Sequence, residues 1–172
     1  GSALDPALAP FKDGLTEKNI RQFLEAYPPT WSARASLVNE KKYRWTKTIS
    51  ATVTHDLIGH LGVGRFKDLE IIGRGDGGRV TGVRVIGTRG QKVVLRELPV
   101  RRLFGNLNSG MFVVDIERSS KGIFQEITFT GGGWGHGVGM CQMGAIGRAE
   151  NGQSFEQILS HYYNGAVTVG IY

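Results

Sequence analysis

Six of the nine residues from 131 to 139 are glycine, and this segment constrains the fold more than any other part of the sequence. Each glycine costs backbone entropy, so a chain concentrates glycines where it needs unusual dihedral angles or where another group approaches the backbone closely. We predict a loop here that leads into a helix running to about residue 150. Unpaired amide groups in such a loop, together with the helix dipole, favour a carbonyl, a carboxylate or another electron-rich oxygen as ligand.

Two polar side chains in and after this loop are candidate binding residues. His136 has glycine on both sides, so its ring has few local neighbours, and Gln142 adds an amide two turns later. At this point a purely structural interpretation stays open. In it, the glycines only allow a strand and a helix to pack closely, and His136 is a hydrogen-bonded core residue.

Other glycine motifs and metal sites fit the sequence poorly. The dinucleotide-binding fingerprint finds no frame, and the Gly-Lys-Ser/Thr sequence of a P-loop does not follow the glycines. His55 and His60 are five residues apart and do not share a helical face, and His161 is remote from both. Cys141 is the single cysteine, which excludes an intrachain disulfide and a cysteine-based zinc site. The sequence therefore predicts no cofactor and no metal.

Composition and charge are those of one globular domain. The 172 residues are 40% hydrophobic and 21% charged, with a formal net charge of +6. The basic residues are scattered, and no basic run is interleaved with aromatic residues, so nucleic acid is not a predicted partner. No apolar run approaches the roughly 18 residues that a membrane span needs.

Hydrophobic periodicity predicts an α+β fold with a mostly antiparallel sheet, flanking helices, and the glycine-rich loop leading into a C-terminal helix pair. Strands are expected at residues 43–49, 66–72, 80–85, 92–96, 111–117 and 123–130. Helices are expected at residues 16–27, 51–61, 98–104, from the glycine loop to 150, and at 155–162. Ser154 and Gln157 form a capping box for the last of these. Residues 1–15 are expected to be extended, and residues 30–42 to be a polar connection.

The glycine segment also belongs to a longer pattern. Residues 133–145 read G-W-G-H-G-V-G-M-C-Q-M-G-A and resemble the signature G-x-G-H-G-V-G-M-[SC]-Q-x-G-A of the stage II sporulation protein D family, which includes the amidase enhancers. Shorter similarities occur at residues 43–45, 78–80, 109–114 and 152–165. We interpret residues 16–172 as the C-terminal portion of such a domain. Residues 1–15 begin with Gly1-Ser2, which looks like the remnant of a cleaved tag.

The resemblance implies a function in the bacterial cell envelope, outside the cytoplasm. Members of the family look like lytic transglycosylases, or accessory proteins, that act on peptidoglycan glycan strands, often strands stripped of their stem peptides. In a lytic transglycosylase the 6-hydroxyl of the sugar attacks and leaves a 1,6-anhydro end, so one glutamic acid can serve as acid and then as base. Trp134 would stack on a sugar face. The implied substrate-binding residues are Trp134, Gly135, His136, Gly137, Gly139 and Gln142.

The sequence departs from the family in one respect. The proposed catalytic glutamate of the family lies in a segment resembling A-x-E-M-P-x-x-W-x-x-E-A-L-K-A-Q-A-V-A-A-R, which has no counterpart here. We therefore assign no catalytic residue and expect the chain alone to bind glycan without cleaving it.

Three alternatives stay open. The chain could be a non-catalytic glycan-binding or enhancer module that recruits an amidase or another cell-wall protein. A carboxylate such as Asp115 or Glu126 could act alone. A sheet edge left open could also pair two copies of the chain.

Overall fold

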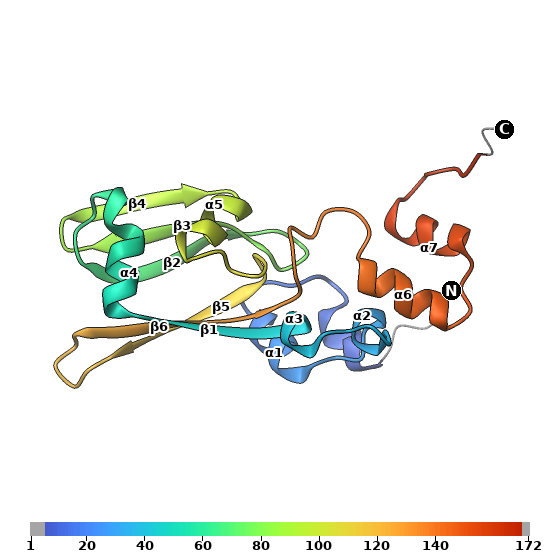
Figure 1. The fold of residues 1–172 in the computed structure, drawn as a ribbon, viewed down its shortest axis with the longest axis horizontal. Helices are drawn as coiled ribbons and strands as arrows, with labels where there is room; N and C mark the ends of the chain where they lie inside the picture. The colour runs from blue at the N-terminus through green and yellow to red at the C-terminus, as the bar shows by residue number, and fades with distance from the viewer. Residues whose placement is uncertain (1–5, 170–172) are drawn as a thin grey trace.

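The computed structural model describes residues 6–169 and has the α+β architecture expected from the sequence. Two three-stranded antiparallel sheets make up the body of the molecule, and helices flank them (Figure 1). One sheet has the order β1-β6-β5 and the other β2-β3-β4. The strands are β1 Arg44–Ser50, β2 Phe66–Arg74, β3 Val80–Gly87, β4 Gly90–Leu95, β5 Phe112–Arg118 and β6 Phe124–Gly132.

The first sheet positions the glycine loop. β6 is its central strand and pairs with β1 from Arg44 opposite Gly132 to Ser50 opposite Glu126. On its other side it pairs with β5, from Phe112 opposite Gly131. The end of β6, where the loop begins, therefore lies between the start of β1 and the start of β5.

The second sheet is a meander of two hairpins. The turn between β2 and β3 is the predicted one at residues 75–78, in which the Gly78 N–H donates to the Gly75 carbonyl and Gly78 has φ +77°. The left-handed conformation explains the glycine at this turn. Arg79 directly follows the turn.

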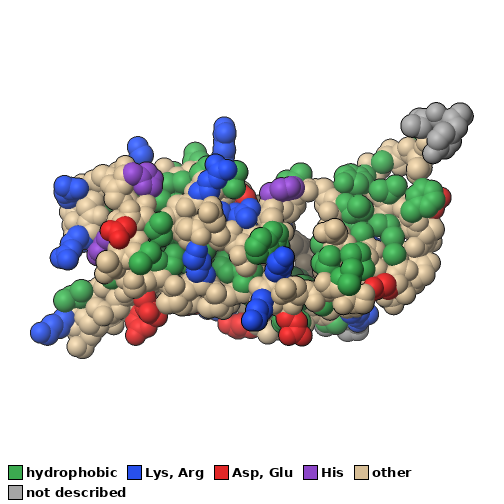
Figure 2. Space-filling model, viewed as in Figure 1, with side chains coloured by type: hydrophobic (Ala, Val, Ile, Leu, Met, Phe, Trp, Pro, Cys, Tyr) green, Lys and Arg blue, Asp and Glu red, His purple; other side chains and the backbone are tan. Residues whose placement is uncertain are grey.

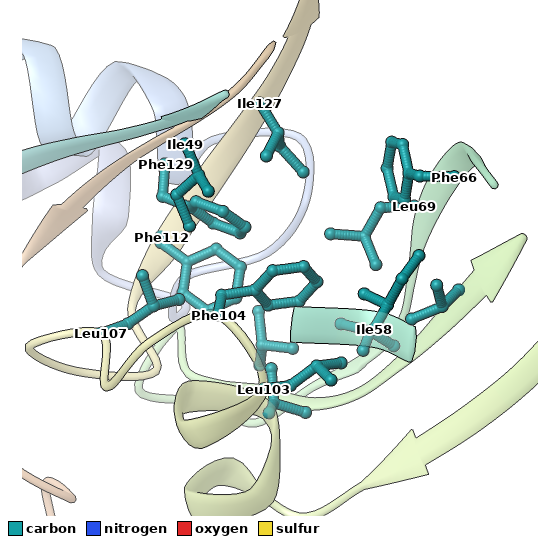
Figure 3. Close-up of a cluster of buried hydrophobic side chains, with 14 of the residues drawn as sticks. Ile49, Ile58, Phe66, Leu69, Leu103, Phe104, Leu107, Phe112, Ile127 and Phe129 are labelled. Atoms are coloured by element: carbon teal, nitrogen blue, oxygen red, sulfur yellow. The ribbon is translucent and has the colours of Figure 1, made fainter. Parts of the chain in front are cut away.

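The core lies between the two sheets and is closed by α4 (Ala51–Ile58) and α5 (Glu97–Leu103). Phe129 is central to it, with its ring 4.8 Å from that of Phe104 and 5.4 Å from that of Phe112. Figure 3 shows these rings together with aliphatic side chains from both sheets and from α4 and α5. The labelled members are Ile49, Ile58, Phe66, Leu69, Leu103, Phe104, Leu107, Phe112, Ile127 and Phe129.

The remaining helices gather at the other end of the molecule (Figure 1). They are α1 Ile20–Ala26, α2 Trp31–Arg34, α3 Glu40–Tyr43, α6 Gln142–Glu150 and α7 Phe155–Tyr162. α6 packs on α2, and α7 packs on α6. The capping box predicted for α7 is confirmed, with the Ser154 and Gln157 side chains each accepting from the other's backbone N–H. No helix within residues 6–169 is long and apolar enough to cross a membrane.

Two expectations about the N-terminal part are wrong. Residues 30–42 contain α2 and α3 instead of a plain polar connection, and the Thr30 hydroxyl caps α2 by accepting from the Ala33 N–H. These helices have four residues each, too few to show an apolar period. Residues 6–11 form a 3-10 helix instead of an extended segment, and the buried Phe11 packs edge-on against Phe23, 5.1 Å away. Residues 1–5 lie outside the described part.

Gly131 is a point of close approach between β6 and the side chain of Trp45. A methyl group there would overlap the Trp45 ring and lie 2.6 Å from the Met111 carbonyl oxygen. Trp45 and Gly131 are cross-strand partners, so the ring folds directly over the glycine. Only the absence of a side chain lets Trp45 occupy this place.

We predict that Gly131→Ala destabilises the fold by about 3 kcal/mol, since neither the ring nor the backbone oxygen can give way without loss of packing. Gly59→Ala is the matched control, because Gly59 has φ −53° and open space around its Cβ position. That change should leave stability unaltered or raise it by about 0.5 kcal/mol. Urea denaturation of both variants measures this. Equal stability of the two variants would contradict the proposed contact.

Candidate functional site

The glycine loop, residues 133–141, has an alternating backbone. Gly133, Gly135, Gly137 and Gly139 all have φ between +73° and +87°, while the residues between them stay outside the left-handed region. Glycine adopts a positive φ without the strain that a side chain would cause. The glycines are thus needed for the conformation of the loop itself.

Hydrogen bonds fix the first half of the loop to the sheet. The Gly133 N–H donates to the Tyr43 carbonyl at 2.9 Å, and the Trp45 indole N–H donates to the Gly133 carbonyl at 3.0 Å. The buried Ser109 hydroxyl donates to the Gly132 carbonyl at 2.7 Å, and the Gly135 N–H donates to the Asn108 carbonyl at 2.9 Å. The loop therefore leaves the sheet in one defined direction.

The second half of the loop is fixed to the C-terminal helices. The Met140 N–H donates to the Tyr163 hydroxyl at 3.2 Å. Cys141 caps α6, with its sulfur accepting from the Gly144 N–H at 3.4 Å and lying 3.3 Å from the Ser32 hydroxyl oxygen. Between these two sets of anchors, residues 136–139 are exposed. Figure 2 shows the hollow between the two-sheet body and the α6–α7 arm, the region that this loop spans.

His136 lies on the surface of the loop, so it is not a core histidine. Its Nδ1 accepts from the Val138 N–H at 2.9 Å. This bond assigns the proton of the neutral ring to Nε2. The ring therefore offers an N–H donor at its outer end.

Trp134 and Gln142 are exposed as well, at the two ends of the same loop. Trp134 is 61% exposed, and the Lys42 ammonium lies 4.7 Å from the centre of its ring. One ring face is thus engaged by a cation, which leaves the other for an apolar ligand surface. Within residues 6–169 the Gln142 amide has no hydrogen-bond partner. All six residues implied by the resemblance therefore belong to one continuous segment.

Arg79 is a part of the site for which the residues alone gave no role. It packs against Gly137, where any Cβ would overlap its guanidinium group. Its Nε is buried without a hydrogen-bond partner among the described residues, and burial lowers the pKa of the guanidinium. The Gly-Arg-Val similarity at residues 78–80 was the only sequence signal. Nothing local indicated contact with a loop 58 positions later.

Together these groups form a surface of hydrogen-bond donors. Residues 133–142 contain no Asp or Glu. Across residues 6–169, no three His, Cys, Asp or Glu side chains are grouped as metal ligands would be. The arrangement can bind electron-rich oxygens, and it contains no carboxylic acid for general acid catalysis.

A hollow of about 440 Å³ between β2 and β5 lies away from the loop. Its charged lining residues are already engaged, with Arg21 bonded to Asp115 at 2.8 Å and Glu17 to Arg74 at 2.7 Å. The side chains that could hold a ligand there are occupied by the protein itself. We therefore place the candidate site at the glycine loop.

The chain is similar to a known protein family and to several known proteins. The family model described as "Domain of unknown function (DUF8618)" matches residues 7–139. Stage II sporulation protein D of Bacillus amyloliquefaciens is 30% identical over 157 residues, which cover 89% of this chain and 41% of that protein. The amidase enhancer of Bacillus subtilis (strain 168) is 55% identical over 38 residues, or 22% of this chain and 5% of the enhancer. The chain thus spans less than half the length of these relatives.

The contact between α6 and α7 depends on pH, because it includes a hydrogen bond between Arg148 and His161. Arg148 donates to His161 Nε2 at 2.8 Å, which requires that nitrogen to be unprotonated. Burial, and then the charge of Arg148, lower the pKa of His161 below that of a free imidazole. Because folding disfavours protonation, this contribution to stability is complete above about pH 6.5 and is lost as the pH falls.

We predict that the imidazole resonance of His161 titrates below pH 6.5 in an NMR experiment. Arg148→Gln should move the midpoint upward, since it removes the neighbouring charge. A midpoint above 6.5 in the unaltered protein would show that the Arg148–His161 bond does not form in solution.

Proposed function

Because the chain belongs to the family described as domain of unknown function DUF8618 and is related to stage II sporulation protein D and the amidase enhancer, we propose that it recognises glycan strands of peptidoglycan. The names of the relatives support a cell-wall-related function. The binding surface in this proposal is the glycine loop, with residues Trp134, Gly135, His136, Gly137, Gly139 and Gln142. The proposed place of action is the cell envelope, outside the cytoplasm.

One observation carries this proposal: the loop exposes donors and one aromatic ring on a single segment. N-acetylated sugars present carbonyl and hydroxyl oxygens at their edges and apolar C–H groups on their faces. His136 Nε2–H, the Gln142 amide and the loop N–H groups match the oxygens. The exposed face of Trp134 matches the sugar face.

The chemistry proposed for the site is recognition within a lytic transglycosylase-like domain. Cleavage needs a carboxylic acid within hydrogen-bonding reach of the glycosidic oxygen. The loop holds none, and the 172 residues contain no match to the glutamate segment of the family. In our proposal this chain forms a wall of the substrate cleft, positions the sugar and does not cleave it alone.

The carboxylates Asp115 and Glu126 are unsuited to act on a sugar held at the loop. Asp115 is bonded to Arg21 and lies opposite Thr128, about 17 Å along β6 from the start of the loop. Glu126 is still further along the same strand, opposite Ser50. Neither reaches the loop.

A second candidate function is a non-catalytic enhancer that recruits an amidase or another cell-wall protein. The observation that favours it is the apolar surface of the α6–α7 arm, where hydrophobic side chains gather in Figure 2. Phe155 is 60% exposed and Tyr163 43% exposed on this arm. Glycan recognition by the loop is common to both functions, and the presence or absence of a partner distinguishes them.

We predict that the chain binds peptide-stripped glycan strands and releases no anhydro-ended product. Pulldown with insoluble strands, followed by mass spectrometry of the soluble fraction, measures both. Anhydro product would place the acid within these residues. Absence of binding would overturn the proposal.

Replacement of His136 by Ala should weaken binding about tenfold, because one exposed donor is lost, while the melting temperature stays within about 1 °C. His60→Ala is the matched control, since His60 is an exposed histidine on the 3-10 helix Gly59–Leu61, outside the loop. Equal loss of binding in the two variants would remove His136 from the site.

A further inference from the structure

Arg79 has fewer polar partners than the other half-buried arginines of the structure. The Nε atoms of Arg84 and Arg148 are also buried without a hydrogen-bond partner, but Arg84 forms an ion pair with Glu70, and Arg148 bonds to Gln153 and His161. Arg74 and Arg101 form ion pairs with Glu17 and Glu97. Arg44 donates to the carbonyls of Leu24, Tyr43 and Phe23 and lies over three aromatic rings. Arg79 has one long hydrogen bond, from Nη1 to the Gly77 carbonyl at 3.5 Å, and no ion pair within residues 6–169.

A guanidinium in this state is unfavourable for the protein alone. Burial removes water from Nε, and no described residue replaces it. An unsatisfied buried donor costs stability, and more so when it is charged. Nη2 has no hydrogen-bond partner among the described residues either, and unlike Nε it is not fully buried.

Glu97 is the carboxylate whose charge acts on Arg79, and it already accepts hydrogen bonds from other groups. Glu97 accepts from Arg101 at 3.3 Å and from the Gly110 N–H at 3.0 Å. Glu97 is thus shared between Arg101 and Gly110. Its charge also favours the charged form of Arg79, but burial outweighs this and lowers the pKa of Arg79, and the two side chains form no ion pair. Gly110 could not hold a side chain in this arrangement, since its Cβ would lie 3.2 Å from Glu97 Oε1 and closer still to Cγ.

The glycine loop adds neutral donors next to this charge. Within the described residues, the N–H groups of His136, Gly137 and Gly139 have no acceptor. Gly137 lies against the guanidinium, with φ +73°, so these unpaired N–H groups belong to a short segment that contacts the arginine. A cation and several N–H donors are the usual composition of a site for a bound oxyanion.

We propose that Arg79 and the turn at Gly137 form a subsite for a carboxylate carried by a sugar. This inference rests on the proposed glycan-binding function and specifies its ligand: the lactyl carboxylate of an N-acetylmuramic acid residue without a stem peptide. A carboxylate is planar and carries one charge, which suits a guanidinium that has no ion pair of its own. When a stem peptide is attached, this carboxylate is an amide and has no charge to offer.

Three ligands of equal length test the inference by isothermal titration. The first is peptide-stripped glycan with free lactyl carboxylates, the second is the same glycan with its carboxyl groups reduced to alcohols, and the third is the glycan with intact stem peptides. We expect the first to bind at least tenfold more tightly than the other two. Tighter binding of the peptide-bearing strands would instead assign the site to a peptide carboxylate and overturn the lactyl assignment.

Arg79→Met should abolish the preference for the first ligand over the second and leave binding of the reduced glycan unchanged. Arg79→Lys should keep part of the preference, since it keeps the charge and loses the planar fork. Arg102→Met is the matched control, because Arg102 is an exposed arginine on α5, and it should keep the full preference. The melting temperature of each variant shows that it is folded.

The outcomes distinguish a failure of the carboxylate subsite from a failure of glycan recognition. Equal affinity of the unaltered chain for carboxylated and reduced glycan would overturn the carboxylate subsite and leave glycan recognition standing. Absence of binding to all three ligands would overturn glycan recognition and the subsite with it. Retention of the full preference by a folded Arg79→Met variant would place the carboxylate elsewhere.

Discussion

The contact of the Trp45 ring with Gly131 is the constraint on which the site depends. Trp45 and Gly131 face each other across β1 and β6, and the ring fills the space that any side chain at Gly131 would need. From this position the indole N–H reaches the Gly133 carbonyl at 3.0 Å. One side chain therefore packs over the end of the central strand and also sets the direction in which the loop leaves it.

The glycine loop is anchored by hydrogen bonds at both ends, and several N–H groups between the anchors have no acceptor among the described residues. The loop is bonded to the sheet through Gly133 and Gly135 and to the C-terminal helices through Met140 and Cys141. Between these anchors the N–H groups of His136, Gly137 and Gly139 have no acceptor within the described chain, and the half-buried Arg79 has one long hydrogen bond and a buried Nε without a partner. The protein has ordered these donors without using them, which is the property of a preorganised binding site. Residues 133–142 themselves contain no Asp or Glu.

Sequence patterns predicted those parts of the fold whose cause is local. Alternation placed all six strands to within about two residues, and the Ser154–Gln157 pair correctly marked the start of α7. The helix α2 was missed because four residues cannot show a period, and its place depends on Gly147 of α6, where a Cβ would overlap the Trp31 carbonyl. For the site, the glycine run indicated the loop correctly. Its partner Arg79 could not be inferred because their contact joins residues 58 positions apart.

In our proposal, different residues between 131 and 142 contribute to the stability of the fold and to ligand binding. Gly131 and Gly132 lie inside the sheet, and their neighbours Trp45 and Ser109 are buried, so changes at these positions act on folding first. His136 and Gln142 are exposed and support little of the fold, so in our proposal changes there act on ligand binding. In our proposal Arg79 belongs to both groups, since its guanidinium packs against Gly137 and forms no ion pair within the described residues. An acceptor supplied by a ligand would satisfy that charge, and binding at this site should therefore also stabilise the fold.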